Sequence, residues 1–171
     1  VLKFEDILLG KKKTINCDRI ENVYGSGKAH KKKFFQNIKK IINKNNFSNF
    51  IDLGLGDAEL INYLLMKNVK INYAGVDLSS KVVNALKKKM KHPKNIVCED
   101  IFKINKWTNK IDKTQFKSDK KLCINFMFTL HENNFAKDSY MIDFLNNLNL
   151  TYPKANLIIT EVFNFPPKIL S

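Results

Sequence analysis

Apolar and polar positions form alternating blocks along the chain, and the spacing within the blocks switches between strand-like and helix-like. The short apolar runs, which are typical of buried strands, cover residues 50–53, 71–76, 95–98, 122–128 and 157–163. Apolar residues at helical spacing predict helices over residues 30–43, 58–67, 81–90 and 138–150. Because strands alternate with helices, we expect an α/β fold with a doubly wound, mostly parallel sheet.

Each expected helix has one apolar face that should pack on the sheet. The residues expected to face inward are Phe34, Phe35, Ile38, Ile41 and Ile42 in the first helix, Leu60, Ile61, Leu64 and Leu65 in the second, Val82, Val83, Leu86 and Met90 in the third, and Tyr140, Met141, Phe144, Leu145 and Leu148 in the fourth. Ser79 or Ser80 can cap the third helix. Residues 101–119 are polar and irregular, with Trp107 and Phe116 as possible anchors.

The length of 171 residues suits one domain with a substantial core. No apolar run approaches the ~20 residues that span a membrane, and no secretory signal is visible, so we expect a cytoplasmic protein without membrane contact. The three cysteines form no Cys-x-x-Cys pair, which argues against a disulfide framework and against a zinc site. Cys98 and Cys123 fall in expected strands and are interpreted as core residues.

The formal net charge of +14 leaves two interpretations open. A strong excess of lysine suits binding to nucleic acid. The same excess is expected of an AT-rich genome, whose codons favour Lys, Asn and Ile, and Arg19 is the sole arginine of the sequence. Because arginine is the preferred residue for bidentate phosphate and base contacts, its scarcity favours codon bias as the main cause.

The stretch over residues 50–60 carries the main functional signal. An apolar strand ends in a turn with Gly54 and Gly56, and a helix then begins. Such glycines let the backbone approach a ligand closely, and the helix start presents free N–H groups. The dinucleotide-binding pattern needs a third glycine where Glu59 stands, and Asp52 would repel a pyrophosphate but attract a cation. The alternative is an ordinary turn between strand and helix.

This turn resembles the first motif of the class I S-adenosylmethionine (SAM)-dependent methyltransferases, which reads roughly acid-x-Gly-x-Gly-x-Gly. Asp52, Gly54 and Gly56 match the motif. Ala58 departs from it at the third glycine, and Leu55 stands where many relatives have a small residue or Cys. The resemblance implies a Rossmann-like methyltransferase sheet and SAM as the cofactor, whose methionine end carries an ammonium and a sulfonium. It also implies that Asp52, Gly54, Leu55 and Gly56 contact SAM.

Two further acids stand at expected strand ends, Asp77 after the second strand and Asp100 after the third. Ligands of open α/β sheets bind at these ends. Asp77 lies about 20 residues beyond the glycine turn, where a carboxylate can accept both ribose hydroxyl hydrogens. The resemblance further implies that Leu78 flanks the adenine, that Asp100 accepts from its amino group, and that the N–H of Ile101 serves a ring nitrogen.

Residues 125–132, which end the fourth strand, form the expected acceptor side of the site. In the family this segment passes under the methionine part of SAM, which implies contacts from Asn125 and Phe126. His131 is the candidate general base, because an imidazole titrates near neutral pH; the alternative is a histidine that only orders the loop. His131 and Glu132 alone are too few to hold a metal, so no metal is expected.

The resemblance divides the single domain into an N-terminal helical lid over residues 1–45 and a SAM-binding core over residues 46–171. In relatives the lid folds over SAM, and Tyr24 is the lid residue expected to contact it. The family sheet normally adds a helix and two more strands after the fifth strand, and the sequence stops at Ser171 before these could form. A missing tail, a trimmed fold or a partner chain that completes the sheet would each account for this.

The function expected from these residues is transfer of a methyl group from SAM to an O or N atom of a small molecule. The segment after the fourth strand lacks the Pro-Pro-aromatic pattern common in enzymes that methylate amino groups of bases. Its Leu130-His131 pair resembles the sequence found at this point in small-molecule methyltransferases. The net charge keeps an RNA methyltransferase, similar to the cap-guanine enzymes, as the alternative. A non-catalytic subunit with the same fold is a third possibility.

Overall fold

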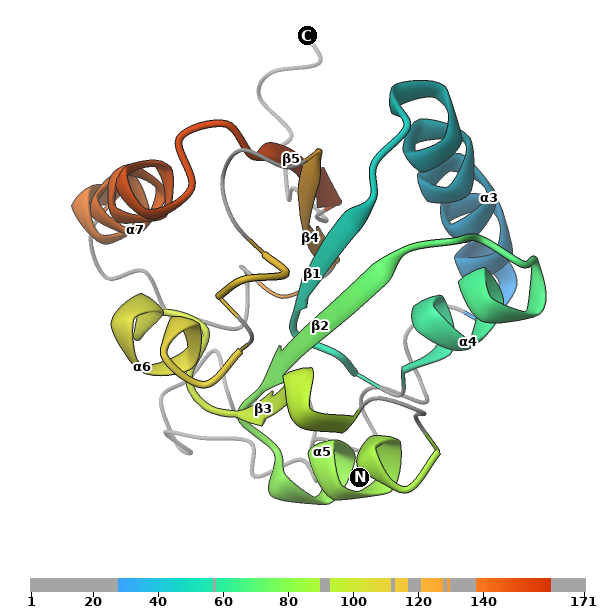
Figure 1. The fold of residues 1–171 in the computed structure, drawn as a ribbon, viewed down its shortest axis with the longest axis horizontal. Coiled ribbons are helices and arrows are strands. Elements are labelled where there is room, and N and C mark those ends of the chain that lie inside the picture. Colours follow the sequence, from blue (N-terminus) through green and yellow to red (C-terminus); the bar gives the residue numbers. More distant parts are fainter. Residues whose placement is uncertain are drawn as a thin grey trace, which may run out of the picture.

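The computed structural model describes residues 28–56, 58–89, 93–111, 113–116, 121–127, 129 and 138–160. Within these residues, five strands form one sheet in which every neighbouring pair is parallel. The strands are β1 (Asn49–Leu53), β2 (Asn72–Asp77), β3 (Ile96–Cys98), β4 (Leu122–Met127) and β5 (Asn156–Thr160). Their order across the sheet is β3-β2-β1-β4-β5, which confirms the predicted doubly wound α/β fold (Figure 1).

Strand β1 lies at the centre of the sheet, between β2 and β4. In the register, Asp52 is paired with Gly75 on one side and with Asn125 on the other. The strand order reverses between β1 and β4, because the chain first builds outward to β3 and then returns to build outward to β5. Ligands of open α/β sheets bind beside such a reversal, at the carboxyl ends of the strands. The predicted glycine turn leaves β1 at this point.

Helices cover both faces of the sheet (Figure 1). One face carries α3 (Lys28–Asn45), α4 (Glu59–Met66) and α5 (Ser80–Lys87). The other face carries α6 (Ile104–Thr108) and α7 (Asp138–Thr151). A short 3-10 helix, η1 (Pro93–Asn95), leads into β3. Successive side chains of a strand point to opposite faces, so two separate apolar cores form.

The core under α6 and α7 contains both anchors predicted for residues 101–119. Trp107 and Phe116 are fully buried there, and the Trp107 ring stacks on Tyr152 at a centroid distance of 6.1 Å. The prediction of irregular structure is wrong in one part of this region, because α6 is a short helix that buries Ile104 and Trp107. At five residues, α6 is too short to show helical periodicity in the sequence.

Six side chains predicted to be inside are exposed: Ile41, Leu65, Tyr140, Cys98 and, in the edge strand β5, Leu157 and Ile159. Ile41 and Leu65 are each next to a buried residue in their helix, so they lie about 100° round the helix from it and point past the sheet. Tyr140 lies in the first turn of α7, one turn before the residues of that helix that are buried on the sheet. Cys98 is the last residue of β3, which is an edge strand.

Two predicted site residues, Tyr24 and His131, lie outside the described residues. The predicted lid is also outside them for residues 1–27, while its last helix, α3, packs on the sheet through buried side chains. The division of the chain at residues 45 and 46 stays a prediction. Among the helices that the structure describes, none is both long enough and apolar enough to cross a bilayer.

Candidate functional site

The turn after β1 is built on left-handed glycines. Gly54 has a φ of 88° and Gly56 a φ of 54°, which residues with a Cβ rarely adopt. The Gly54 N–H donates to the Val76 carbonyl at 2.8 Å, so the start of the turn is still held to the end of β2. A Cβ on Gly54 would overlap the side chain of Thr129, whose hydroxyl donates to the Leu53 carbonyl at 3.2 Å. Conformation and space both require glycine at position 54.

Leu55, between the two glycines, points back into the protein. Its side chain is buried and occupies the space that a Cβ on Gly75 would need. Leu55 thus supports the turn from the centre of the sheet, and any contact it makes with a ligand would come from its main chain. The following helix, α4, begins after Ala58, which has a φ of 61° and forms no side-chain cap.

Asp77, the last residue of β2, joins the glycine turn to the next helix. Its carboxylate is buried and accepts from the Gly56 N–H at 3.3 Å and from the Ser79 N–H at 2.8 Å. Ser79 caps α5 by accepting from the Val82 N–H, as predicted. Each carboxylate oxygen can accept a further hydrogen bond. Leu78, the next residue, is 58% exposed, so its side chain is available to cover an apolar part of a ligand.

Asp52 is buried in β1 between donors from both neighbouring strands. Tyr73 Oη donates to Oδ2 at 3.0 Å, and Asn125 Nδ2 donates to Oδ1 at 2.8 Å. Burial raises the pKa of Asp52 to about 6; the two hydrogen bonds oppose this rise, and the charge of Asp77 adds to it. Burial and the charge of Asp52 also raise the pKa of Tyr73, so its hydroxyl keeps the proton that it donates.

The amide oxygen of Asn125 has no hydrogen-bond partner among the described residues, although the side chain is completely buried. A buried acceptor without a donor costs roughly 1–3 kcal/mol. No lysine or arginine in the described part of the chain forms an ion pair with Asp52 or Asp77. The carboxyl ends of β1, β2 and β4 therefore hold two carboxylates and an amide oxygen that a cationic ligand with N–H groups would satisfy.

Asp100 and Ile101 follow β3, whose last residue is paired with Asp77. One oxygen of Asp100 accepts from the Phe102 N–H at 3.0 Å, and the other lies 3.7 Å from Lys103 Nζ. Ile101 is buried, and its carbonyl accepts from Trp107 Nε1 at 2.9 Å. Asp100 thus orders the turn after β3, while its carboxylate stays partly exposed. The contacts of this pair with adenine stay a prediction.

Phe126 points away from Asn125, because neighbouring residues of a strand face opposite sides of the sheet. Its ring is fully buried under α7, where it meets Phe144 edge to face at a centroid distance of 5.8 Å. The side chain is therefore part of the core. A contact between Phe126 and a ligand beside Asp52 would have to come from the main chain.

The structure thus brings five of the predicted site residues together at the switch point: Asp52, Gly54, Gly56, Asp77 and Asn125. Sequence reasoning missed Tyr73 and assigned no role to Thr129. Tyr73 shares a face of β2 with Asp77 by the period of two, and this was the signal that could have found it. Within the described residues, no group of three His, Cys, Asp or Glu side chains is placed to hold a metal ion.

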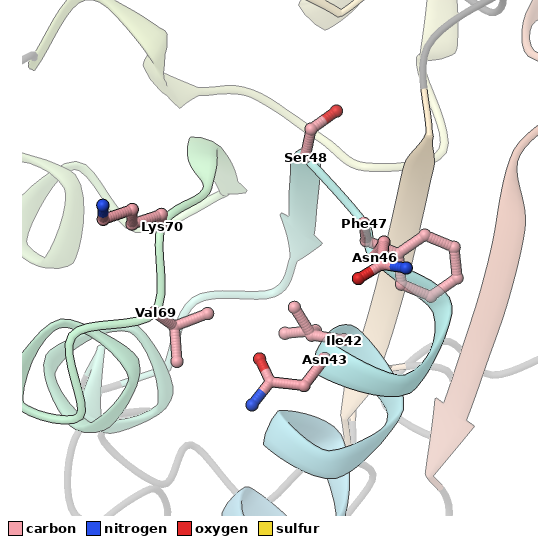
Figure 2. Close-up of a pocket in the computed structure, with 7 residues that line it drawn as sticks. All are labelled: Ile42, Asn43, Asn46, Phe47, Ser48, Val69 and Lys70. Carbon is pink, nitrogen blue, oxygen red and sulfur yellow. The ribbon is translucent and has the colours of Figure 1, made fainter.

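The pocket drawn in Figure 2 lies at the other end of the sheet. It has a volume of about 390 Å³ and is lined by Ile42, Asn43, Asn46, Phe47, Ser48, Val69 and Lys70. These residues end α3 or precede β1 and β2, so the pocket lies at the amino ends of the strands. It contains none of the predicted site residues, and ligands of open α/β sheets bind at the opposite ends.

A solved structure shares this fold. The plantazolicin methyltransferase BpumL, in complex with a pentazolic desmethylPZN analog and SAH, aligns with a TM-score of 0.54 and 16% sequence identity over 84% of this chain. That alignment covers 52% of BpumL, so the chain spans about half the length of that protein. A second structure, BpumL in complex with SAH, aligns with a TM-score of 0.39 and 14% identity over 82% of this chain and 56% of the other. No protein-family model and no curated protein matches the chain.

Proposed function

We propose that this chain is a SAM-dependent methyltransferase that binds SAM over the turn at Gly54 and Gly56. The observation that carries the proposal is the pair of buried carboxylates, Asp52 and Asp77, which lie beside the turn without a cationic partner among the described residues. SAM brings an ammonium and a sulfonium, and either charge would favour the ionised form of Asp52. The fold shared with a methyltransferase solved with SAH supports the proposal.

The methionine and ribose parts of SAM would lie along the carboxyl ends of β1 and β2. Asp52 attracts the ammonium, and the unsatisfied oxygen of Asn125 is an acceptor for one of its N–H groups. Gly54 and Gly56 allow the cofactor to approach the main chain closely. Asp77 accepts from the ribose hydroxyls with the capacity that its two backbone donors leave unused.

The adenine would lie toward β3. Leu78 is exposed at the end of β2 and flanks the ring, and the partly exposed Asp100 accepts from the adenine amino group. The N–H of Ile101 serves a ring nitrogen. The main chains of Leu55 and Phe126 complete the contacts, because both side chains are buried in the protein.

SAM, when bound, would supply a methyl group on an activated sulfonium, whose carbon–sulfur bond would break as the acceptor oxygen or nitrogen bonds to the methyl carbon in line. The role of this chain's own residues would be to orient the cofactor for the acceptor. His131 is the proposed base that takes the acceptor proton. No further catalytic group is required, because the sulfonium leaves as a neutral thioether.

The proposed acceptor is a small molecule. BpumL was solved with a pentazolic desmethylPZN analog, and the segment after β4 lacks the Pro-Pro-aromatic pattern of base methyltransferases. RNA is the second candidate, because the net charge is +14. An RNA acceptor would make binding weaken steeply with salt, with a slope that counts the phosphate contacts.

Incubation of the full chain with isotopically labelled SAM and with pools of metabolites and RNA, followed by mass spectrometry, tests the proposal. We expect label in a small-molecule fraction, lost in Asp77→Ala and kept in Asn72→Ala, a matched control at the other end of β2. Label in RNA would replace the first acceptor by the second. A protein that neither binds SAM nor transfers its methyl group would contradict the proposal and favour the non-catalytic subunit.

A further inference from the structure

We infer that Tyr73 is a positioning residue, whose hydroxyl holds the Asp52 carboxylate in place beneath the glycine turn. The inference rests on the proposed SAM site and goes beyond it, because Tyr73 acts on the ligand only through Asp52. Tyr73 is 7% exposed and lies deeper in the sheet than the strand ends where a ligand would bind.

The position of the Tyr73 hydroxyl is set by packing. Tyr73 Oη donates to Asp52 Oδ2 at 3.0 Å. Its ring stacks on Phe50 at a centroid distance of 6.2 Å and an interplanar angle of 14°, which limits movement of the ring. Gly75 is paired with Asp52 and shares a face of β2 with Tyr73, so no side chain of β2 comes between hydroxyl and carboxylate.

The other groups around Asp52 do not replace this donor. Asn125 holds Oδ1 from β4, and Asp77 brings a like charge from β2. Cys123 of β4 is buried, and burial raises its pKa to about 12, so the thiol stays neutral. From α3 and α4 the same core receives Phe35, Ile38, Ile42, Leu60, Ile61, Leu64 and the partly buried Tyr63. Loss of the Tyr73 hydroxyl would therefore leave Oδ2 without its hydrogen-bond donor in the described part of the chain.

Two matched variants test the inference. Tyr73→Phe removes the hydroxyl and keeps the ring on Phe50. Tyr152→Phe is the control, because Tyr152 is also buried and stacks on Trp107 in the core of the opposite face. The titration of the Asp52 carboxyl carbon is followed by NMR in the full chain, and SAM affinity is measured by calorimetry between about pH 5 and pH 8.

In Tyr73→Phe the midpoint of the Asp52 titration is expected to rise by about one pH unit, because a hydrogen bond to a carboxylate favours its charged form. The pH at which half the SAM affinity is lost should rise with it, and Tyr152→Phe should match the wild type in both. An unchanged midpoint in Tyr73→Phe, or an equal change in Tyr152→Phe, would overturn the inference. A raised midpoint in a protein that binds no SAM would leave the hold on Asp52 standing and remove the proposed function instead.

Discussion

The two ends of the sheet treat their buried polar groups in opposite ways. At the amino end, Asn72 Nδ2 donates to Asn49 Oδ1 at 2.9 Å. Gln115 extends this network, since its Nε2 donates to Asn72 Oδ1 at 3.2 Å and its Oε1 accepts from Asn95 Nδ2 at 2.9 Å. At the carboxyl end, two carboxylates are buried near each other, and the oxygen of Asn125 has no partner among the described residues.

Under the proposed function, this difference separates polar groups that stabilise the fold from polar groups that bind a ligand. The amino-end amides are neutral, and the two that are buried, Asn49 and Asn95, each have a hydrogen-bond partner in this network, so their burial costs little. At the carboxyl end, burial raises the pKa of Asp52 to about 6, so its charged form lowers stability unless a cation binds. Unfavourable arrangements of this kind are expected at functional sites. The pocket at the amino end, although it has a defined volume, lacks this signature.

The largest effect is expected from Gly54→Ala. Alanine would have to adopt a left-handed backbone conformation, and its Cβ would overlap Thr129. The free energy of unfolding should therefore fall by about 2–5 kcal/mol, and SAM binding should be lost. Asn46→Ala is the control at the amino end. Asn46 is exposed and has a φ of 52°, so its replacement by alanine should lower the free energy of unfolding by about 1 kcal/mol. Denaturant unfolding measures both, and equal losses would contradict the close approach of Thr129.

Asp52→Asn should make the protein more stable and its binding weaker. The pKa of about 6 in the folded state exceeds the ordinary value of 3.8, so the ionised carboxylate destabilises the fold above about pH 6, and this cost disappears as the pH falls toward 3.8. The variant should gain roughly 2 kcal/mol at pH 8 and less at pH 5, because it removes a buried charge whose cost is larger at the higher pH. Thermal unfolding at both pH values measures this, and an equal gain at pH 5 would refute the assignment.

Asp77→Ala and Asn72→Ala should separate binding from stability along one strand. Loss of the Asp77 carboxylate removes charge-assisted hydrogen bonds to the ribose, so SAM affinity should fall at least about tenfold. Loss of the Asn72 amide leaves Oδ1 of the buried Asn49 without its donor, so stability should fall by about 1–3 kcal/mol while SAM affinity is unchanged. Calorimetry measures SAM affinity and denaturant unfolding measures stability in both variants. Equal losses of affinity and of stability in the two variants would contradict this prediction.

The smallest effect is expected from Leu78→Ser. The side chain is 58% exposed, so the free energy of unfolding should change by less than about 0.5 kcal/mol. SAM affinity should fall by roughly threefold, because less apolar surface of the adenine is covered. Leu65→Ser is the control, since Leu65 is 49% exposed on α4 and has no predicted role in binding. Equal affinities in the two variants would remove Leu78 from the site.

Local patterns in the sequence were enough to predict the sheet and the turn. Strand and helix periodicity indicated all five strands, and the spacing of Asp52, Gly54 and Gly56 indicated a turn suited to binding a ligand. Asp77 was found because its distance along the chain from the turn is characteristic of a second strand end. These features depend on neighbouring residues or on a fixed spacing, which a sequence displays directly.

Features that depend on packing between strands could not be predicted. The hydrogen bond from Tyr73 to Asp52 requires the register of β1 on β2, and the overlap of Thr129 with position 54 requires the path of the chain after β4. The inward direction of Leu55 follows from the space above Gly75, which the sequence does not reveal. Phe126 was predicted as a contact because it lies in the segment that passes under SAM in the family that the sequence resembles, yet alternation along β4 places its ring in the opposite core.

The central claim is that SAM binds at the carboxyl ends of the strands, and amide NMR of the full chain with SAM added tests it most directly. The account predicts saturable changes in chemical shift at Gly54, Gly56 and Ser79, whose main chains border the two acids. Val69 and Lys70, in the pocket at the amino end, should not change. No change at millimolar SAM, or changes confined to the amino end, would contradict the account.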